Sequence, residues 1–451
     1  MRKSKSAQVD SPRVSGDKIP LKAFIQGINS NPKFQKAFHW GKLVTITGTA
    51  QVLIQIMSLV AGILIIRLLP TSEYALYTLA NTMLGTMAVL SDSGITVGVM
   101  SEAGKVWGDK STLGSVLATG LKLRRKFGIT GLLITGPILM YLLLSHGASW
   151  LMTVLITLSL VPAFFATLSD SLLEVPPKLH QDIGPLQKNG LLTTIGRLVL
   201  TGSTNFLFPF TFVAILAGGI PRIWANIQLK KISIPYVDWN QSSDPVIEEK
   251  ILKTVKRTLP SSIYFCVSGQ ITVWLISIFG STESVAQLGA LGRLSMILSI
   301  FTVMFQILII PRYARLPSNK PIILRWFVLL QILLAVFALV VIVLAHFFAK
   351  DILWIIGKNY AGLEDMLVLA IASAVIGAMS GVLFGILMAR NWIMHPALSI
   401  GVGIVSQIVL ISIVDLSTLR GIYYFSILNT LVGIVLSYVY VVYRVRTAKP
   451  V

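Results

Sequence analysis

Two long apolar blocks of equal length constrain this chain more than any other feature. Each block holds about 185 residues, and one polar segment, residues 228–258, separates them. Because the hydrocarbon core of a membrane contains no water, a segment that crosses it must bond its own backbone groups in a helix or a closed barrel. The apolar runs are continuous and lack the alternation of barrel strands. The sequence therefore predicts two helical membrane-embedded halves joined by a polar cytoplasmic linker.

The composition is typical of a polytopic membrane protein. Hydrophobic residues make up 54% of the 451 residues and charged residues only 12%, and the mean hydropathy is +0.78. A net charge of +20 would suggest nucleic-acid binding in a soluble protein, but no soluble basic domain is available, so we expect no nucleic-acid partner. The single cysteine, Cys266, excludes an internal disulfide and a multi-cysteine metal site. We expect neither a metal nor a cofactor.

The apolar segments predict twelve helical spans, six in each half. The predicted spans cover residues 43–66, 74–100, 127–144, 151–172, 190–207, 209–227, 259–279, 285–310, 322–345, 366–388, 393–413 and 422–443. The corresponding domains are a basic tail at 1–42, a six-helix bundle at 43–227, the linker at 228–258, a second six-helix bundle at 259–443 and a tail at 444–451. The predicted fold class is an all-α polytopic membrane protein with about twelve transmembrane helices.

The two predicted bundles contain a weak internal sequence repeat. The turns at 69–77 and 280–289 each follow an apolar span, contain Ser or Thr and Glu, and precede a span rich in small residues. A like-with-like match between halves of the same orientation predicts a pseudo-twofold axis along the membrane normal.

The distribution of basic residues predicts the orientation. Alternate segments, including both termini, hold 31 of the 38 Lys and Arg, and the opposite loops hold only Lys350, Lys358 and Arg420. The positive-inside rule therefore places both termini in the cytoplasm and the chain in the cytoplasmic (inner) membrane. We expect the basic N-terminal tail to contact the anionic inner leaflet of the bilayer.

Four arginines remain outside the loops: Arg67, Arg197, Arg222 and Arg293. An ionised side chain at the bilayer centre costs about 2.5–3.5 kcal/mol on insertion scales, so its presence needs a reason. Arg197 and Arg293 lie inside predicted spans, and we expect both to face a cavity. Since a guanidinium can donate two hydrogen bonds to a phosphate, all four are candidates to bind an anionic group of a substrate. The alternatives are internal pairing or carbonyl capping for Arg197 and Arg293, and snorkelling to the interface for Arg67 and Arg222.

Acidic residues avoid the middle of the predicted spans. Asp92 and Asp170 lie near the inner ends of the second and fourth spans. A cation exporter driven by protons or sodium is expected to carry a carboxylate within the membrane. Asp92 and Asp170 are therefore the candidates for coupling or gating. The charges inside the predicted spans are positive, however, and this favours an anionic substrate.

Two stretches resemble a known family. The segment 67–77 reads RLLPTSEYALY and is followed by LSDSGIT at 90–96, and the segment 286–316 contains Arg293 within its span. Both resemble the polysaccharide-exporter flippases, the O-antigen flippase group of the superfamily that also contains multidrug-and-toxin exporters. The chain departs from that family's turn, where glycines are usual, and has a longer polar N-terminal tail.

The resemblance implies two six-helix bundles around a central cavity that opens alternately to the two sides of the membrane. It implies an undecaprenyl-diphosphate-linked oligosaccharide as substrate, flipped to the outer leaflet for O-antigen or exopolysaccharide biosynthesis. Polysaccharide assembly proteins are the protein partners that it implies.

Three alternatives remain beside the flippase. An ion-coupled multidrug or cation exporter of the same superfamily would require a coupling carboxylate in the membrane. A membrane-embedded polysaccharide polymerase or lipid-modifying enzyme would require a large outer loop or an interfacial cluster of His, Asp and Arg, whereas the predicted outer loops are short. A membrane scaffold would leave the interior arginines unexplained. The sequence has no G-x-x-x-x-G-K-[ST] loop for ATP, so we expect the energy for transport to come from an ion gradient or from the substrate gradient. Since the predicted outer loops offer no domain for a catalytic site, we expect a transporter that is not an enzyme.

Overall fold

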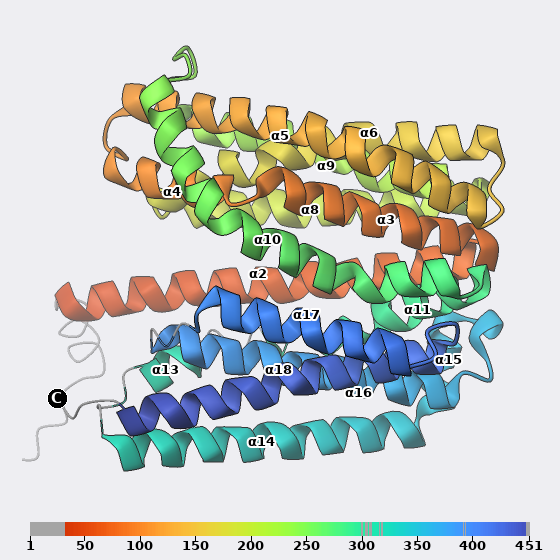
Figure 1. The fold of residues 1–451 in the computed structure, drawn as a ribbon. Coiled ribbons are helices and arrows are strands. Elements are labelled where there is room, and N and C mark those ends of the chain that lie inside the picture. Colours follow the sequence, from red (N-terminus) through yellow and green to blue (C-terminus); the bar gives the residue numbers. More distant parts are fainter. Residues whose placement is uncertain are drawn as a thin grey trace, which may run out of the picture. The chain divides into compact units, whose positions relative to one another are not determined.

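The structure, a computed structural model, describes residues 32–447 except 299–300, 303–304, 306–308, 315, 317–318, 391 and 393. It forms two compact units, residues 1–49 and 50–451, and every contact discussed below lies within the second. In the described part every regular element is a helix, which confirms the all-α prediction (Figure 1). Most of the two predicted tails, at 1–42 and 444–451, lies outside the described residues.

The N-terminal half comprises the helices before the polar segment. They are α2 (Pro32–Leu68), α3 (Thr71–Asp92), α4 (Ile95–Lys105), α5 (Lys110–Ser145), α6 (Trp150–Leu173), α7 (Val175–Leu179), α8 (Ile183–Leu207), α9 (Thr211–Ser233) and the short 3-10 helix η1 (Ile234–Tyr236). Helix α6 packs on α5 and α9, and α9 also packs on α8.

The C-terminal half comprises the helices that follow. They are α10 (Pro245–Phe279), α11 (Thr282–Ser295), α13 (Ile310–Ala314), α14 (Lys320–Phe347), α15 (Ala349–Ile356), η2 (Lys358–Tyr360), α16 (Glu364–Ala389), α17 (Pro396–Ile413) and α18 (Leu419–Thr447). Helix α16 packs on α14 and α18, and α17 packs on α18.

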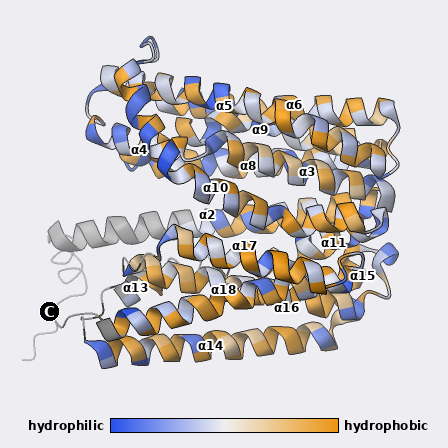
Figure 2. Ribbon diagram, in the orientation of Figure 1, coloured by the Kyte–Doolittle hydropathy of each residue, from blue (hydrophilic) through white to orange (hydrophobic). Residues whose placement is uncertain are grey.

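The chain is a multi-pass membrane protein. Nine described helices are long and apolar enough to cross a membrane, and α3 with α4, bent by 43°, would make a tenth. Figure 2 shows hydrophobic residues along the length of helices such as α14 and α6. The described helices α8 and α11 fall outside this set, because α8 contains Lys188, Arg197 and many small polar residues and α11 is only 14 residues long. These two less apolar helices carry the two arginines predicted to face a cavity.

Several helices extend beyond the predicted spans. Helix α5 begins at Lys110, well before the predicted start at residue 127, because the Asp109 side chain caps it by accepting hydrogen bonds from the amides of Ser111 and Thr112. A hydrogen bond from the Thr112 hydroxyl, followed by those from the two amides, holds the pKa of Asp109 below its ordinary value. The extra turns have an exposed basic face and carry no continuous apolar signal, so hydropathy alone could not find them.

The predicted cytoplasmic linker is largely helical. Helix α9 continues to Ser233, and α10 begins at Pro245, where Asp244 caps its first turn. Ile247, Ile251 and Val255 of α10 recur at helical spacing and are buried against α4 and α5. The segment thus packs as an amphipathic helix against the N-terminal half. The domain boundaries drawn at 43–227 and 259–443 stay predictions.

Among the described residues, the largest apolar cluster that the two halves share lies at one end. The largest cluster of buried residues contains the start of α3 (Tyr74), the start of α11 (Leu288), and α15 (Leu353), at the ends predicted to face outward. At the opposite ends the cores are separate, one in the N-terminal half with α10 and one in the C-terminal half. We call the first cluster the shared outer core. Its side chains hold the halves together at the predicted outer ends.

Candidate functional site

A sharp break between α3 and α4 positions Asp92. Ser93 and Gly94 adopt left-handed conformations with φ of 43° and 90°, and a Cβ at Gly94 would lie only 2.0 Å from Thr258 Oγ1 of α10. The chain then restarts as α4 with Asp92 at its head, where Oδ1 accepts hydrogen bonds from Thr96 N at 3.1 Å and Thr96 Oγ1 at 2.5 Å. Asp92 also lines a cavity of about 540 Å³ between this break and α10.

Arg124 of α5 is the ion-pair partner of Asp92. Its Nη2 donates to Asp92 Oδ1 at 2.6 Å, and its side chain is only 7% exposed. Its Nη1 donates to the carbonyl of Leu168 at 2.7 Å and to Ser171 Oγ at 2.5 Å, both on α6. The predicted spans end at residue 100 and resume at 127, and so leave Arg124 in a loop; that prediction is wrong, because α5 starts at Lys110. No signal in the sequence separates Arg124 from its basic neighbours.

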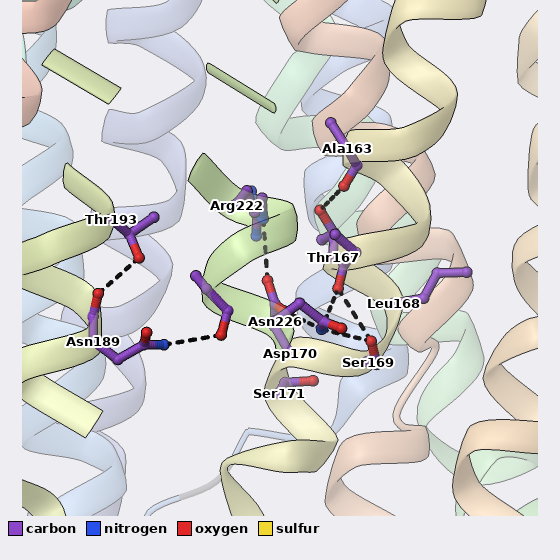
Figure 3. A network of polar contacts seen from close by, with 12 residues as sticks. Ala163, Thr167, Leu168, Ser169, Asp170, Ser171, Asn189, Thr193, Arg222 and Asn226 are labelled. Atoms are coloured by element: carbon purple, nitrogen blue, oxygen red, sulfur yellow. Dashed lines mark hydrogen bonds and ion pairs between the residues drawn. The ribbon is translucent and has the colours of Figure 1, made fainter. Parts of the chain in front are cut away.

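Asp170 of α6 pairs with Arg222 of α9 (Figure 3). Arg222 Nε lies 3.1 Å from Asp170 Oδ2, and Asn226 Nδ2, one turn further along α9, donates to Asp170 Oδ1 at 2.6 Å. Asn226 Nδ2 also lies 2.7 Å from Ser169 Oγ. Arg222, predicted to bind a substrate anion, therefore has its charge balanced within the N-terminal half.

The two ion pairs form one polar network. Ser171, next to Asp170, accepts from Arg124 and lies 3.1 Å from Thr96 Oγ1, which itself contacts Asp92. The negative charges of two carboxylates and the positive charges of two arginines thus cancel among α3, α4, α5, α6 and α9. In a low-dielectric environment such pairs are costly to break, because one partner is left as an uncompensated charge. We call these residues the paired network.

Arg197 of α8 and Arg293 of α11 are arranged differently. Each is half-buried, and in the described part of the chain neither forms an ion pair with a carboxylate. Glycines make room for both: a Cβ at Gly218 would lie 3.7 Å from Arg197 Nε, and a Cβ at Gly62 would lie 3.3 Å from Arg293 Cδ. Arg197 and Arg293 each interact electrostatically with the buried Tyr77 of α3.

Arg67 caps a helix instead. At the end of α2, its Nη2 and Nε donate to the carbonyls of Trp354 at 2.7 Å and Ile355 at 2.8 Å. These carbonyls lie at the C-terminal end of α15, where orphan acceptors favour a cation. The Arg67 guanidinium also lies 5.3 Å from the centroid of the Trp354 ring. This contact joins the first helix of one half to the other half at the predicted outer side.

No His, Cys, Asp or Glu trio in the described residues is grouped closely enough to hold a metal ion.

Three solved structures are similar over most of the chain. An inward-facing multidrug resistance MATE family transporter of the MOP superfamily has a TM-score of 0.68 at 15% identity, covering 88% of this chain and 96% of that one. The lipid II flippase MurJ, in an inward closed conformation, has a TM-score of 0.67 at 14% identity, covering 90% and 88%. An outward-facing MATE family transporter of the MOP superfamily has a TM-score of 0.61 at 15% identity, covering 94% and 99%.

No protein-family model and no curated protein matches the sequence of this chain. At the identities above, the likeness establishes the fold, which is the twelve-helix, two-lobe fold of the MATE and MurJ transporters of the MOP superfamily. The predicted fold class of two six-helix bundles is thereby confirmed.

Proposed function

We propose that this chain is a MOP-superfamily flippase that moves a lipid-linked oligosaccharide across the cytoplasmic membrane. The substrate would carry a diphosphate between an undecaprenyl chain and a sugar head, and would pass from the inner to the outer leaflet for surface polysaccharide biosynthesis. The similarity to the lipid II flippase MurJ supports a lipid-linked substrate, and the resemblance of the segment 67–77 to polysaccharide exporters supports a sugar head.

The observation that carries the proposal is the pair Arg197 and Arg293. They come from opposite halves, both interact electrostatically with Tyr77, and neither is paired with a carboxylate in the described residues. An arginine that stays in a membrane protein without an internal counter-ion is expected to meet an anion supplied by a ligand. Two guanidinium groups from two lobes suit a diphosphate, because each can donate two parallel hydrogen bonds to phosphate oxygens.

The proposed site contains two of the four arginines that the sequence predicted as candidates. Arg67 caps α15 and Arg222 pairs with Asp170, so both already have partners in the protein. We assign the phosphate contact to Arg197 and Arg293 alone. The prenyl chain would remain in the bilayer while the polar head passes between the halves.

Transport would proceed by alternating access of the two halves. The shared outer core supports an inward-facing resting state, since at the predicted inner ends the described apolar clusters are separate and only α10 packs on the N-terminal half. A diphosphate that enters from the inner side would draw the arginines of the two lobes toward one ligand.

A second candidate is an ion-coupled exporter of drugs or other cations. The paired network favours it, because Asp92 lines the cavity beside α10 and is joined through Ser171 to the segment of α6 that carries Asp170. The similarity to MATE family multidrug transporters is compatible with this role. In this case Asp92 and Asp170 would bind or release the coupling ion.

The experiment that separates the two candidates measures lipid-linked oligosaccharides in a strain that lacks this protein. The flippase predicts that undecaprenyl-linked repeat units accumulate on the inner leaflet and that surface polymer is lost. Unchanged lipid pools together with altered sensitivity to cationic compounds would instead support the exporter.

A variant series tests the site itself. We expect Arg293→Ala to lower polymer export about 10- to 100-fold, the loss expected for hydrogen bonds to a charged group. Arg293→Lys should retain little activity if the bidentate fork is needed, and much more if charge alone suffices. Arg325→Ala removes an exposed arginine of α14 and serves as the matched control. Normal export by Arg293→Ala at wild-type protein levels would eliminate the proposed phosphate contact.

A further inference from the structure

A basic cavity that neither Arg197 nor Arg293 lines is found in the N-terminal half. Its volume is about 330 Å³, and it is bounded by α5, α6, α9 and the turn after η1. Arg124, Arg125, Lys230 and Trp239 line it, and within the described residues no carboxylate does. We call it the basic pocket.

The charges of the basic pocket are only partly compensated. Arg124 is paired with Asp92, whereas Arg125 and Lys230 are exposed and lie in no described ion pair. The Lys230 ammonium lies 6.0 Å from the centroid of the Trp239 ring, which brings cation and aromatic surface together. The pocket therefore presents two uncompensated positive charges beside a third that is buried.

Two buried donors in the same pocket lack a protein acceptor. Arg124 Nε and Trp239 Nε1 are both shielded from solvent, and neither has a hydrogen-bond partner in the described structure. A buried donor without an acceptor costs about 1–3 kcal/mol, so an acceptor from a ligand would be stabilising. An oxyanion would accept hydrogen bonds from such donors and would balance the charges of the two free cations.

The walls of the pocket indicate where that oxyanion comes from. Phe165, Leu168 and Leu173 of α6 form an apolar side, and Phe165 is exposed. The pocket lies at the ends of α5, α6 and α9 that the charge distribution predicts to be cytoplasmic, near the level of lipid headgroups. Basic pockets between transmembrane helices at this level bind the heads of anionic lipids, and tryptophan is enriched at the same level.

We propose that the basic pocket binds the phosphate of an anionic phospholipid of the inner leaflet. The phosphate accepts hydrogen bonds from the pocket's cationic side chains and from Trp239, and the glycerol and acyl region lies along the apolar wall. None of the residues that line this site is Arg197 or Arg293, so it is distinct from the phosphate contact proposed for the transported substrate.

The test compares two charge-matched double variants of the purified full chain in neutral detergent. Arg125→Gln with Lys230→Gln removes the free cations of the pocket, and Lys126→Gln with Lys231→Gln removes the next residue on each helix, outside the pocket. Affinity for dioleoyl-phosphatidylglycerol is measured by titration, with dioleoyl-phosphatidylcholine and inorganic phosphate as the other probes.

We expect the wild type and the Lys126/Lys231 control to bind phosphatidylglycerol in preference to phosphatidylcholine. The pocket variant should bind phosphatidylglycerol about 30-fold more weakly, since each basic side chain near an anionic headgroup contributes about fivefold. Equal binding by both variants would overturn the proposal. Inorganic phosphate that binds as tightly as phosphatidylglycerol would overturn the lipid as the source of the oxyanion.

Discussion

The two halves share a fold plan but use polar residues differently. In the N-terminal half, arginines of α5 and α9 pair with carboxylates of α3 and α6 at 2.6 Å and 3.1 Å. Among the described residues of the C-terminal half, the one ion pair joins Arg420 to Asp365 at 3.7 Å, with both side chains exposed. Its helices are connected instead by neutral hydrogen bonds, for example from Tyr438 Oη to Gln331 Oε1 at 2.8 Å.

This difference indicates a division of labour. Neutral hydrogen bonds between membrane helices contribute little each and tolerate loss. Charged pairs within a membrane are costly to maintain and therefore mark function or strict positional control. The N-terminal half thus concentrates the residues whose protonation or ligand contacts can change, while the C-terminal half supplies a packed apolar partner and Arg293.

The largest expected effect comes from removing Arg124. Arg124→Gln leaves Asp92 without its buried partner, and we expect a loss of about 3–5 kcal/mol in unfolding free energy. Arg420→Gln removes the exposed pair of the other half and should change stability by at most about 1 kcal/mol. Thermal unfolding of both variants in detergent measures the contrast, and equal shifts in the melting temperature would show that the halves do not differ in this respect.

A smaller effect is expected at Asp170. Its partner Arg222 is 43% exposed, so Asp170→Asn leaves a cation that can still reach solvent, and we expect a loss of about 1–3 kcal/mol. Adding Arg222→Gln should recover part of that loss, because the uncompensated charge is removed. A double-mutant cycle on unfolding measures the coupling. Strictly additive losses would indicate that the pair does not interact.

The smallest effect is expected from Tyr438→Phe in the C-terminal half. It removes the hydroxyl that donates to Gln331 and keeps the ring, which packs edge-on against Phe327. We expect a loss of about 0.5–1.5 kcal/mol, the usual contribution of one neutral hydrogen bond. A loss as large as that of Arg124→Gln would contradict the view that neutral contacts in this half are individually dispensable.

Hydropathy predicted the all-helical fold class but not where the helices begin and end. Helices α5 and α10 extend to Lys110 and Pro245 because their added turns bury one apolar face and expose a basic one, a pattern that a search for continuous apolar runs passes over. The break at Ser93 and Gly94 was missed for a related reason, since the apolar content continues across it.

The sequence indicated candidate site residues only where a charge lies within a predicted span. Arg197 and Arg293 stood out for this reason, and their role in binding stays a prediction. Arg124 did not stand out among neighbouring basic residues. The partnership of Asp170 with Arg222 joins two helices far apart in the chain, and tertiary packing alone creates it.

The shared outer core has a consequence for temperature. If transport separates the start of α3 from the start of α11, side chains such as Tyr74 and Leu288 must leave an apolar environment for water. Burial of such surface is largely entropic near 25 °C and carries a negative heat-capacity change. The attraction that keeps the outer ends together therefore weakens on cooling. The balance between the two conformations should consequently shift toward outward opening in the cold, and transport rates should follow a curved rather than a linear Arrhenius plot.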